Sequence, residues 1–153
     1  GVVSIFYNRI LASQPISLYE QGKPGRDFVH ISDIVQANLL ALDTDTGPWS
    51  CINVGAGVDS PITDVASALA AACGRNPEFQ DLGEYRVGDI HSCYADLGEA
   101  ERLLGFRPRT NLVDGMQEFA DWARHQQSED NYQRTVDELE RYGLFGRAGS
   151  PPK

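Results

Sequence analysis

The chain has 153 residues, 41% of them hydrophobic and 23% charged, which is the size and composition of one soluble globular domain and excludes a disordered, fibrous or membrane-embedded protein. Its formal net charge is -9, from 13 Lys and Arg against 22 Asp and Glu. An acidic surface repels polyanions, so no nucleic acid partner is expected.

The first part of the chain is expected to form two helices and two short strands. Apolar residues recur at helical spacing over residues 2–12, and residues 16–19 show the alternating, β-branched and aromatic pattern of a strand. A turn rich in glycine and proline then leads to a second strand at residues 28–31. Ser32 is the expected N-cap of a helix that runs to about Leu42.

The middle of the chain is expected to contain a loop, a short strand and an alanine-rich helix. Residues 43–50 form the loop, and residues 51–54 form the strand. Ser60 caps the helix, a proline occupies its first position, and the helix extends over residues 61–72 until Gly74 stops it.

The remaining elements are two short strands, an irregular segment and three helices, the first of which is capped by Asp96 and ended by Gly105. In chain order they are expected at residues 78–80 (strand), 85–89 (irregular), 92–95 (strand), 96–105, 112–125 and 129–142 (helices). Short strands interleaved with helices predict a small mixed α/β lobe. Residues 1–145 are assigned to this lobe, and residues 146–153 to a flexible tail.

Cysteines and histidines give no sign of a metal site or a disulfide framework. The cysteines are odd in number and widely spaced, without a CxxC pair or a histidine cluster, so we expect buried, reduced thiols. Reduced thiols, together with the lack of a leader and of an apolar run near the ~20 residues of a membrane span, predict a cytoplasmic protein without a membrane partner. The histidines are expected to be structural. These residues are Cys51, Cys73, Cys93, His30, His91 and His125.

Residues 53–57, Asn-Val-Gly-Ala-Gly, raise the possibility of a dinucleotide-binding loop. That fingerprint needs a third small residue, a helix that opens at once, and an acidic residue ~20 positions further on. Ser60 takes the third position, but the helix begins only after a longer turn, and the distant position falls in a loop near Pro77. The segment is therefore predicted to be a plain strand-to-helix turn.

Arg26 and Arg86 stand out against the acidic background of the chain. Each lies in an irregular segment from which a planar guanidinium could bind diphosphate oxygens in bidentate fashion. The alternative is a surface ion pair, for which Asp27 and Asp89 are nearby partners. On the residues alone, both alternatives are open.

Several motifs, in order along the chain, carry a family resemblance. Residues 15–22 (Pro-Ile-Ser-Leu-Tyr-Glu-Gln-Gly) and 26–37 (Arg-Asp-Phe-Val-His-Ile-Ser-Asp-Ile-Val-Gln-Ala) are similar to the second half of extended short-chain dehydrogenase/reductase proteins that act on nucleotide sugars. Further matches are Asn53-Val54-Gly55 with Gly57, Arg86-Val87-Gly88-Asp89-Ile90, Tyr94-Ala95-Asp96, residues 100–108 and residues 112–122. The resemblance covers residues 1–124.

The resemblance implies the carboxyl-terminal part of an NAD-dependent nucleotide-sugar epimerase or dehydratase, similar to UDP-glucose 4-epimerases or dTDP-sugar epimerases. In that family an amino-terminal Rossmann half carries the Gly-rich NAD loop and a catalytic Tyr-x-x-x-Lys pair. The only lysines here are Lys23 and Lys153, and neither is expected to belong to such a pair. We therefore expect the chain to be inactive alone, without catalytic residues or bound cofactor, because NAD would be held by the missing Rossmann half of the full-length enzyme.

Carried over residue by residue, the resemblance implies a binding site for a UDP- or dTDP-sugar. Arg26 and Arg86 would bind the diphosphate, and Asp89 would accept a hydrogen bond from a ribose hydroxyl. The backbone around Leu18 and Tyr19 would lie against the pyrimidine base.

Two positions in these motifs depart from the family pattern. Glu20 stands where many relatives have glycine, and Val87 stands where many have proline. The departures concern the base contact and the shape of the loop, and neither removes a charged group of the expected site.

The first hypothesis for function is the substrate-binding lobe of a 4-epimerase, in which NAD removes and returns a hydride through a keto-sugar intermediate. The alternatives are the lobe of a 4,6-dehydratase, a non-catalytic nucleotide-sugar-binding module, and a structural helical domain in which the arginines are incidental. The abrupt apolar start at residues 1–6 indicates a chain cut within a larger protein. We expect a monomer for this chain and a homodimer for the full-length enzyme.

Overall fold

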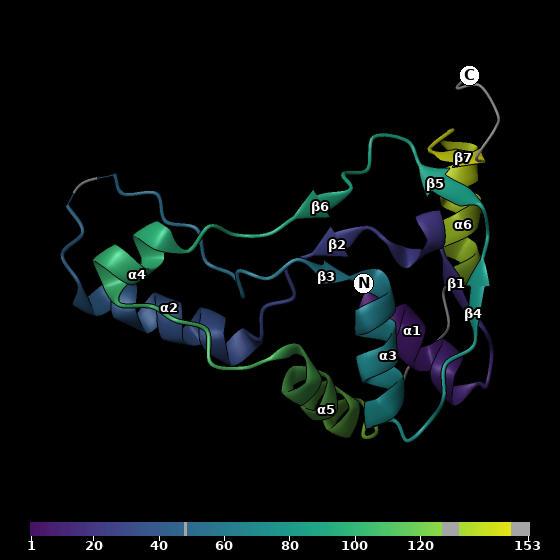
Figure 1. The fold of residues 1–153 in the computed structure, drawn as a ribbon, viewed down its shortest axis with the longest axis horizontal. Helices are drawn as coiled ribbons and strands as arrows, with labels where there is room; N and C mark the ends of the chain where they lie inside the picture. Colours follow the sequence, from purple (N-terminus) through teal and green to yellow (C-terminus); the bar gives the residue numbers. More distant parts are fainter. Residues whose placement is uncertain (48, 127–131, 148–153) are drawn as a thin grey trace.

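The computed structural model describes residues 1–47, 49–126 and 132–147. Six α-helices, one 3-10 helix and seven short strands follow one another in these ranges (Figure 1). In chain order they are α1 (Val2–Leu11), β1 (Ile16–Leu18), η1 (Glu20–Gly22), β2 (Gly25–Arg26), α2 (Ile31–Asp43), β3 (Ser60–Pro61), α3 (Ile62–Ala72), β4 (Phe79–Asp81), β5 (Glu84–Arg86), β6 (Ser92–Cys93), α4 (Gly98–Leu104), α5 (Leu112–Ala123), α6 (Tyr132–Arg141) and β7 (Phe145–Arg147). No helix in these ranges is long and apolar enough to cross a membrane.

The strands form three small sheets rather than one large one. β1 pairs with β4 in parallel, with Ile16 opposite Phe79. β2 lies between β3, which is antiparallel to it, and β6, which is parallel to it. β5 and β7 form an antiparallel pair. Strands of two or three residues have few ladder hydrogen bonds, so packing of the helices must hold the lobe together.

The main hydrophobic core is formed by α1, α3, α5 and β1. α3 packs against both α1 and α5 (Figure 1). Tyr7 of α1 meets Phe119 of α5 edge to face, with ring centroids 5.8 Å apart. The buried members of this core are Phe6, Tyr7, Ile10, Ile16, Leu18, Val65, Ala66, Leu69, Ala70, Met116, Ala120 and Ala123.

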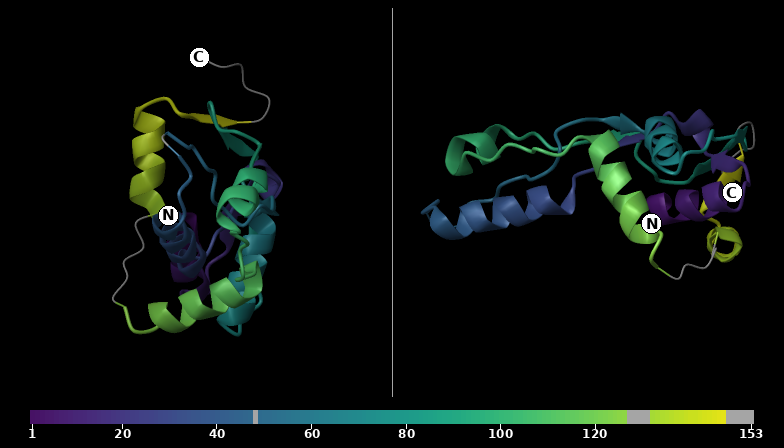
Figure 2. Two further views of the ribbon diagram at one scale, coloured as in Figure 1. Left: turned by 90° about the vertical axis from the view of Figure 1, so that its left-hand side faces the viewer. Right: turned by 90° about the horizontal axis from the view of Figure 1, so that it is seen from below.

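A second, smaller core lies in an arm made of α2 and α4. Figures 1 and 2 show these two helices side by side, projecting from the rest of the lobe. Their buried contact consists of Ala37, Ala100, Leu104 and Phe106. The arm is therefore held by far less apolar burial than the main core.

The Asp27 carboxylate connects the arm to the central sheet, which is the three-stranded sheet of β3, β2 and β6. Asp27 follows β2 directly and accepts hydrogen bonds from the backbone N–H groups of Ala56 (2.7 Å), Gly57 (3.0 Å) and Ala95 (3.0 Å). Gly55 is required beside it, because a Cβ there would lie 2.3 Å from the Asp27 Oδ2 atom. One side chain thus joins three segments that are distant in sequence.

The helices predicted from apolar periodicity are confirmed, whereas two of the predicted strands are wrong. α1, α3 and α5 begin and end within two residues of their predicted bounds. Residues 28–31 and 51–54 form no strand. In the first segment His30 has an extended backbone (φ -75°, ψ 145°), but it precedes α2 and does not pair with another strand. After the second segment, the N–H groups of Ala56 and Gly57 bond to Asp27 rather than to a neighbouring strand.

The predicted N-caps are also displaced. α2 begins at Ile31, and its N-cap is His30, whose side chain accepts a hydrogen bond from the Ser32 N–H group, so Ser32 is not the cap. Ser60 does not cap α3, because it pairs with Arg26 in β3 and the helix starts at Ile62. Two-residue strands such as β2 and β3 leave no periodic signal in a sequence.

The cysteines differ from the prediction of buried thiols. All three are free, but Cys51 and Cys93 are exposed, and only Cys73, near the main core, is half-buried. Desolvation by burial raises the pKa of the Cys73 thiol.

The carboxyl-terminal predictions lie partly outside the described residues. Of the predicted helix at 129–142, α6 covers Tyr132–Arg141, and residues 129–131 lie outside the described ranges. Of the predicted tail at 146–153, residues 146 and 147 belong to β7, and residues 148–153 lie outside the described ranges.

Replacing Asp27 with asparagine should lower the free energy of unfolding by about 2–4 kcal/mol, because one acceptor of three backbone N–H groups becomes an amide that also carries donors. Urea unfolding measures this. The control is Asp45→Asn, since among the described residues Asp45 bonds only the nearby Gly47 N–H group, and its loss should cost less than about 0.5 kcal/mol. Equal losses in both variants would contradict the assigned role of Asp27.

The thiols should differ in their rate of alkylation at pH 7. Cys51 and Cys93 should react quickly with iodoacetamide, and Cys73 slowly, because burial both shields its sulfur and raises its pKa. Peptide mapping by mass spectrometry over a time course distinguishes the three sites. Cys73 reacting as fast as the other two would show that the α3 end is open.

Candidate functional site

A cavity of about 440 Å³ brings together four of the five residues predicted for the site. Its walls come from α1, β1, η1, β2, the start of α3 and the loop before β6. The four predicted residues are Leu18, Tyr19, Arg26 and Asp89, and the other lining residues are Gly1, Val2, Ile5, Phe6, Arg9, Ser17, Glu20, Pro24 and Ile62.

The Arg26 guanidinium is held in one orientation by backbone and carboxylate acceptors. Its Nη2 donates to the Asp89 Oδ1 at 2.6 Å, and its Nη1 donates to the Gly25 carbonyl at 2.6 Å and to the His91 carbonyl at 3.4 Å. Within the described ranges its Nε–H has no recorded acceptor. Because Nη2 carries two N–H groups and one of them bonds to Asp89, the Nε–H and the second Nη2–H are the donors left for an anion.

Asp89 has one oxygen committed and one available. Its Oδ1 accepts from Arg26 and from the Ile90 N–H group at 3.0 Å. The Oδ2 has no recorded donor among the residues described. Both alternatives for Arg26 therefore apply in part: it forms the surface ion pair with Asp89, and it also lines a cavity. Asp27, the other suggested partner, bonds to backbone N–H groups instead.

The free edge of β1 forms another part of the wall. In the parallel pair with β4, Ile16 N–H donates to the Glu78 carbonyl at 2.7 Å and the Leu18 carbonyl accepts from Leu82 N–H at 3.2 Å. Alternate residues of a parallel strand bond to opposite edges. The N–H and C=O of Ser17 therefore point away from β4, and Ser17 lines the cavity.

Arg86, the fifth predicted residue, is placed by its backbone only. It lies in β5 opposite Phe145 of β7. Its side chain lies outside what the structure describes, so its contact with a diphosphate stays a prediction.

Sequence reasoning missed Arg9 and Ser17, and did not assign Glu20 a role. Arg9 lies on α1, which was interpreted only through its apolar stripe, and its Nε donates to the Pro15 carbonyl at 2.6 Å. Ser17 contributes through its peptide group, which carries no sequence signal. Glu20 could have been found, because it stands at a position where glycine is common and has a positive φ of 48°.

The expectation of no Tyr-x-x-x-Lys pair was wrong as a statement about spacing, since Tyr19 and Lys23 are four residues apart. On an α-helix that spacing places both side chains on one face. Here Glu20 and Gln21 between them have positive φ angles of 48° and 60°. The two residues therefore do not have the helical arrangement that the spacing normally indicates.

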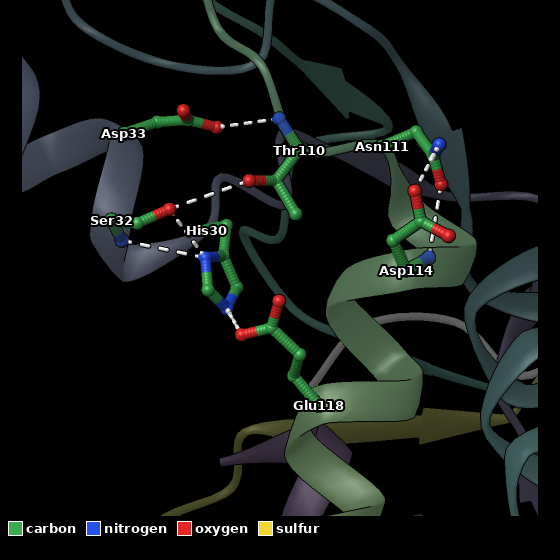
Figure 3. Close-up of polar contacts among 7 residues, drawn as sticks. All are labelled: His30, Ser32, Asp33, Thr110, Asn111, Asp114 and Glu118. Carbon is green, nitrogen blue, oxygen red and sulfur yellow. Dashed lines mark hydrogen bonds and ion pairs between the residues drawn. The ribbon is translucent and has the colours of Figure 1, made fainter.

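A second cavity, of about 540 Å³, lies between α1, α5 and residues 28–31 and is mostly apolar. His30 lines this cavity, and Figure 3 shows it between α2, which carries Ser32, and α5, which carries Glu118. The His30 Nδ1 lies 2.8 Å from the Ser32 Oγ, and its Nε2 lies 3.4 Å from the Glu118 Oε2. The polar groups here connect α2 with α5.

Asp33 reinforces this connection. It is 2% exposed and accepts hydrogen bonds from the Arg109 N–H (3.0 Å) and the Thr110 N–H (3.1 Å), as Figure 3 shows for Thr110. The second cavity thus borders a structural junction. Among the residues described, no group of three or more His, Cys, Asp or Glu is arranged to hold a metal ion.

Residues 1–55 match the NAD dependent epimerase/dehydratase family. The chain is 34% identical, over 122 residues, to dTDP-L-rhamnose 4-epimerase of Burkholderia thailandensis, covering 80% of this chain and 33% of that protein. The chain therefore spans about a third of the length of this curated relative.

Solved structures agree with the sequence matches. The fold is similar to UDP-glucose 4-epimerase of Thermotoga maritima with UDP-glucose (TM-score 0.69, 28% identity, 81% of this chain and 39% of that chain). It is also similar to UDP-glucuronic acid 4-epimerase of Bacillus cereus with UDP-glucuronic acid and NAD (TM-score 0.72, 25% identity, 81% and 40%). These likenesses confirm the predicted mixed α/β fold, equivalent to part of a Rossmann-type epimerase, and the predicted family resemblance.

Replacing Asp89 with asparagine should change the free energy of unfolding by less than about 1 kcal/mol, because the side chains of Arg26 and Asp89 are 27% and 40% exposed and solvent screens the pair. Urea unfolding beside Asp27→Asn measures the contrast. A loss as large as that of Asp27→Asn would mean that the Arg26–Asp89 pair holds the fold together rather than serving the cavity.

Proposed function

Because the chain resembles the carboxyl-terminal part of NAD-dependent nucleotide-sugar epimerases and dehydratases, we propose that it is the nucleotide-sugar-binding lobe of a 4-epimerase and is inactive alone. The observation that carries the proposal is the cavity beside α1, where a free strand edge, a fixed guanidinium and an available carboxylate oxygen converge. A nucleoside diphosphate sugar presents a complementary group to each of these: a base, a diphosphate and a ribose hydroxyl.

The pyrimidine base is proposed to lie against the free edge of β1. The Ser17 peptide offers one donor and one acceptor on that edge. A uracil or thymine ring presents the matching pair, a ring N–H and a carbonyl oxygen. Leu18 and Tyr19 would flank the ring, as the resemblance implies.

The diphosphate is proposed to bind to Arg26. The overall charge of -9 opposes any dianion, so a site for one depends on local groups. Because the Gly25 carbonyl and Asp89 already fix the guanidinium, little side-chain entropy would be lost on binding. Asp89 Oδ2 would accept a hydrogen bond from a ribose hydroxyl, and Arg86 would add a second positive charge beside the diphosphate.

NAD is proposed to bind to the amino-terminal half that the longer relatives carry, where it would supply hydride transfer. The glycine-rich residues of this chain do not fit a pyrophosphate loop. A Cβ at Gly55 would meet Asp27 Oδ2 at 2.3 Å, and one at Gly57 would meet Leu97 Cδ1 at 2.8 Å. Both glycines are thus used in packing within the lobe. This chain would position the sugar for the chemistry.

The arm is the proposed contact with that amino-terminal half. α2 exposes a row of apolar side chains at helical spacing: Ile31 (68%), Val35 (50%), Leu39 (57%) and Leu42 (82%). The row lies on the projecting arm of Figure 1. A row of this kind is unfavourable in water and is typical of a helix that packs against another surface.

Calorimetric titration with UDP-glucose tests the proposal. Arg26→Ala should weaken binding at least tenfold, because a charge-assisted contact to phosphate is lost. Arg102→Ala is the matched control: it removes the same charge from a surface pair with Glu99, outside the cavity, and should leave the Kd unchanged.

Equal effects of the two substitutions would show that only net charge matters and would count against the site. Failure of the folded wild-type chain to bind any of UDP-glucose, dTDP-glucose or UDP-glucuronic acid would overturn the proposal that this lobe holds the nucleotide sugar on its own. Titration with NAD should show no binding.

A further inference from the structure

Glu20 is held in a backbone conformation that is unfavourable for it. Its φ is 48°, and Gln21 and Gly22 follow with φ angles of 60° and 69°. Only glycine adopts this left-handed region without steric cost, because a Cβ comes close to the neighbouring carbonyl. Three consecutive residues in this region make the sharp turn after β1, and two of them are not glycine.

The backbone of Glu20 takes part in the turn, where its carbonyl accepts from the Lys23 N–H at 3.2 Å, but in the described ranges its side chain adds no contact that compensates for the strain. Within the part of the chain described, its carboxylate has no recorded hydrogen bond or ion pair, and the residue is exposed. Asp27 and Asp33, by contrast, bond to backbone N–H groups and hold segments together. Backbone strain that no side-chain contact within the protein offsets is characteristic of residues that contact a ligand.

The position of Glu20 connects it with the cavity. It lines the cavity directly after the free edge of β1, on the same wall as Ser17 and Tyr19. A carboxylate repels phosphate, so it cannot belong to the diphosphate end of a ligand that Arg26 binds. It can only accept hydrogen bonds, so the group it meets must be a donor.

We infer that Glu20 is a specificity-determining residue whose carboxylate accepts a hydrogen bond from the nucleoside end of the ligand. The inference rests on the proposed function, because it assumes that a nucleoside diphosphate occupies this cavity. The donor is either the ring N–H of the base, which Glu20 would share with the Ser17 carbonyl, or the ribose 2′-hydroxyl, and both are absent from simple phosphate or pyrophosphate. Glu20 thus makes the cavity selective for nucleosides rather than for anions in general.

Three variants test this inference in the full 153-residue chain. Glu20→Gln removes the charge and keeps the shape, and Glu20→Gly removes both the side chain and the strain. The matched control is Gln21→Gly, which relieves strain at the next residue, outside the cavity lining. The probe is UDP, and Tm and Kd are measured for each variant.

Both glycine variants should raise Tm by about 1–3 °C, because the strained backbone is relieved. Glu20→Gln and Glu20→Gly should weaken UDP binding by about 3- to 10-fold, whereas Gln21→Gly should leave it unchanged. A gain in stability combined with a loss of affinity distinguishes a ligand contact from a structural role. Pyrophosphate binding should not be weakened in any of the three.

Two further ligands identify the donor. If the ribose 2′-hydroxyl is the donor, Glu20→Gln will not weaken binding of 2′-deoxyuridine diphosphate. If the base is the donor, it will not weaken binding of 3-methyluridine diphosphate, which lacks the ring N–H. Weakening of both ligands as strongly as of UDP would overturn the inference.

The outcomes also separate this inference from the proposed function. If Arg26→Ala weakens UDP binding but Glu20→Gln leaves Kd within twofold of the wild-type value, the inference is wrong and the proposed function stands. If the folded wild-type chain does not bind UDP, the proposed function and the inference both fail.

Discussion

The carboxylate of Asp27 is the constraint on which the rest of the lobe depends. Consecutive residues of an extended segment point to opposite sides, so Arg26 and Asp27 have separate tasks. Asp27 accepts hydrogen bonds from the N–H groups of Ala56, Gly57 and Ala95. These bonds fix the position of the segment that carries Arg26. The Arg26 guanidinium is therefore positioned on one side by the part-buried hydrogen bonds of Asp27 and on the other side by Asp89.

The same use of carboxylates recurs along the chain. Asp33 bonds two N–H groups before α5, and Asp59 accepts from Ser92 Oγ at 2.6 Å beside the central sheet. Acidic residues thus replace strand pairing in a protein whose strands are only two or three residues long. Several carboxylates of this acidic chain therefore bond to its own backbone or to a neighbouring hydroxyl.

The parts of the structure that follow from local periodicity could be predicted from the sequence, and the parts that follow from long-range contacts could not. α3 and α5 have apolar faces that specify both their type and their extent. β2 exists only because Ser60 and Cys93 come to lie beside Arg26, so no local pattern announces it. Four residues that line the cavity were named through motif resemblance, whereas Arg9, which also lines it, was hidden by the apolar pattern of its helix.

The division of the lobe into two hydrophobic clusters affects how its stability is observed. A unit held by four buried residues can open without the main core. The two tryptophans are not equally sensitive to unfolding of the main core and of the arm. Trp122 packs against Phe119 in α5, whereas Trp49, in the loop after α2, is 99% exposed. Intrinsic fluorescence would therefore follow the main core and miss an opening of the arm, while amide hydrogen exchange in α2 and α4 would register it.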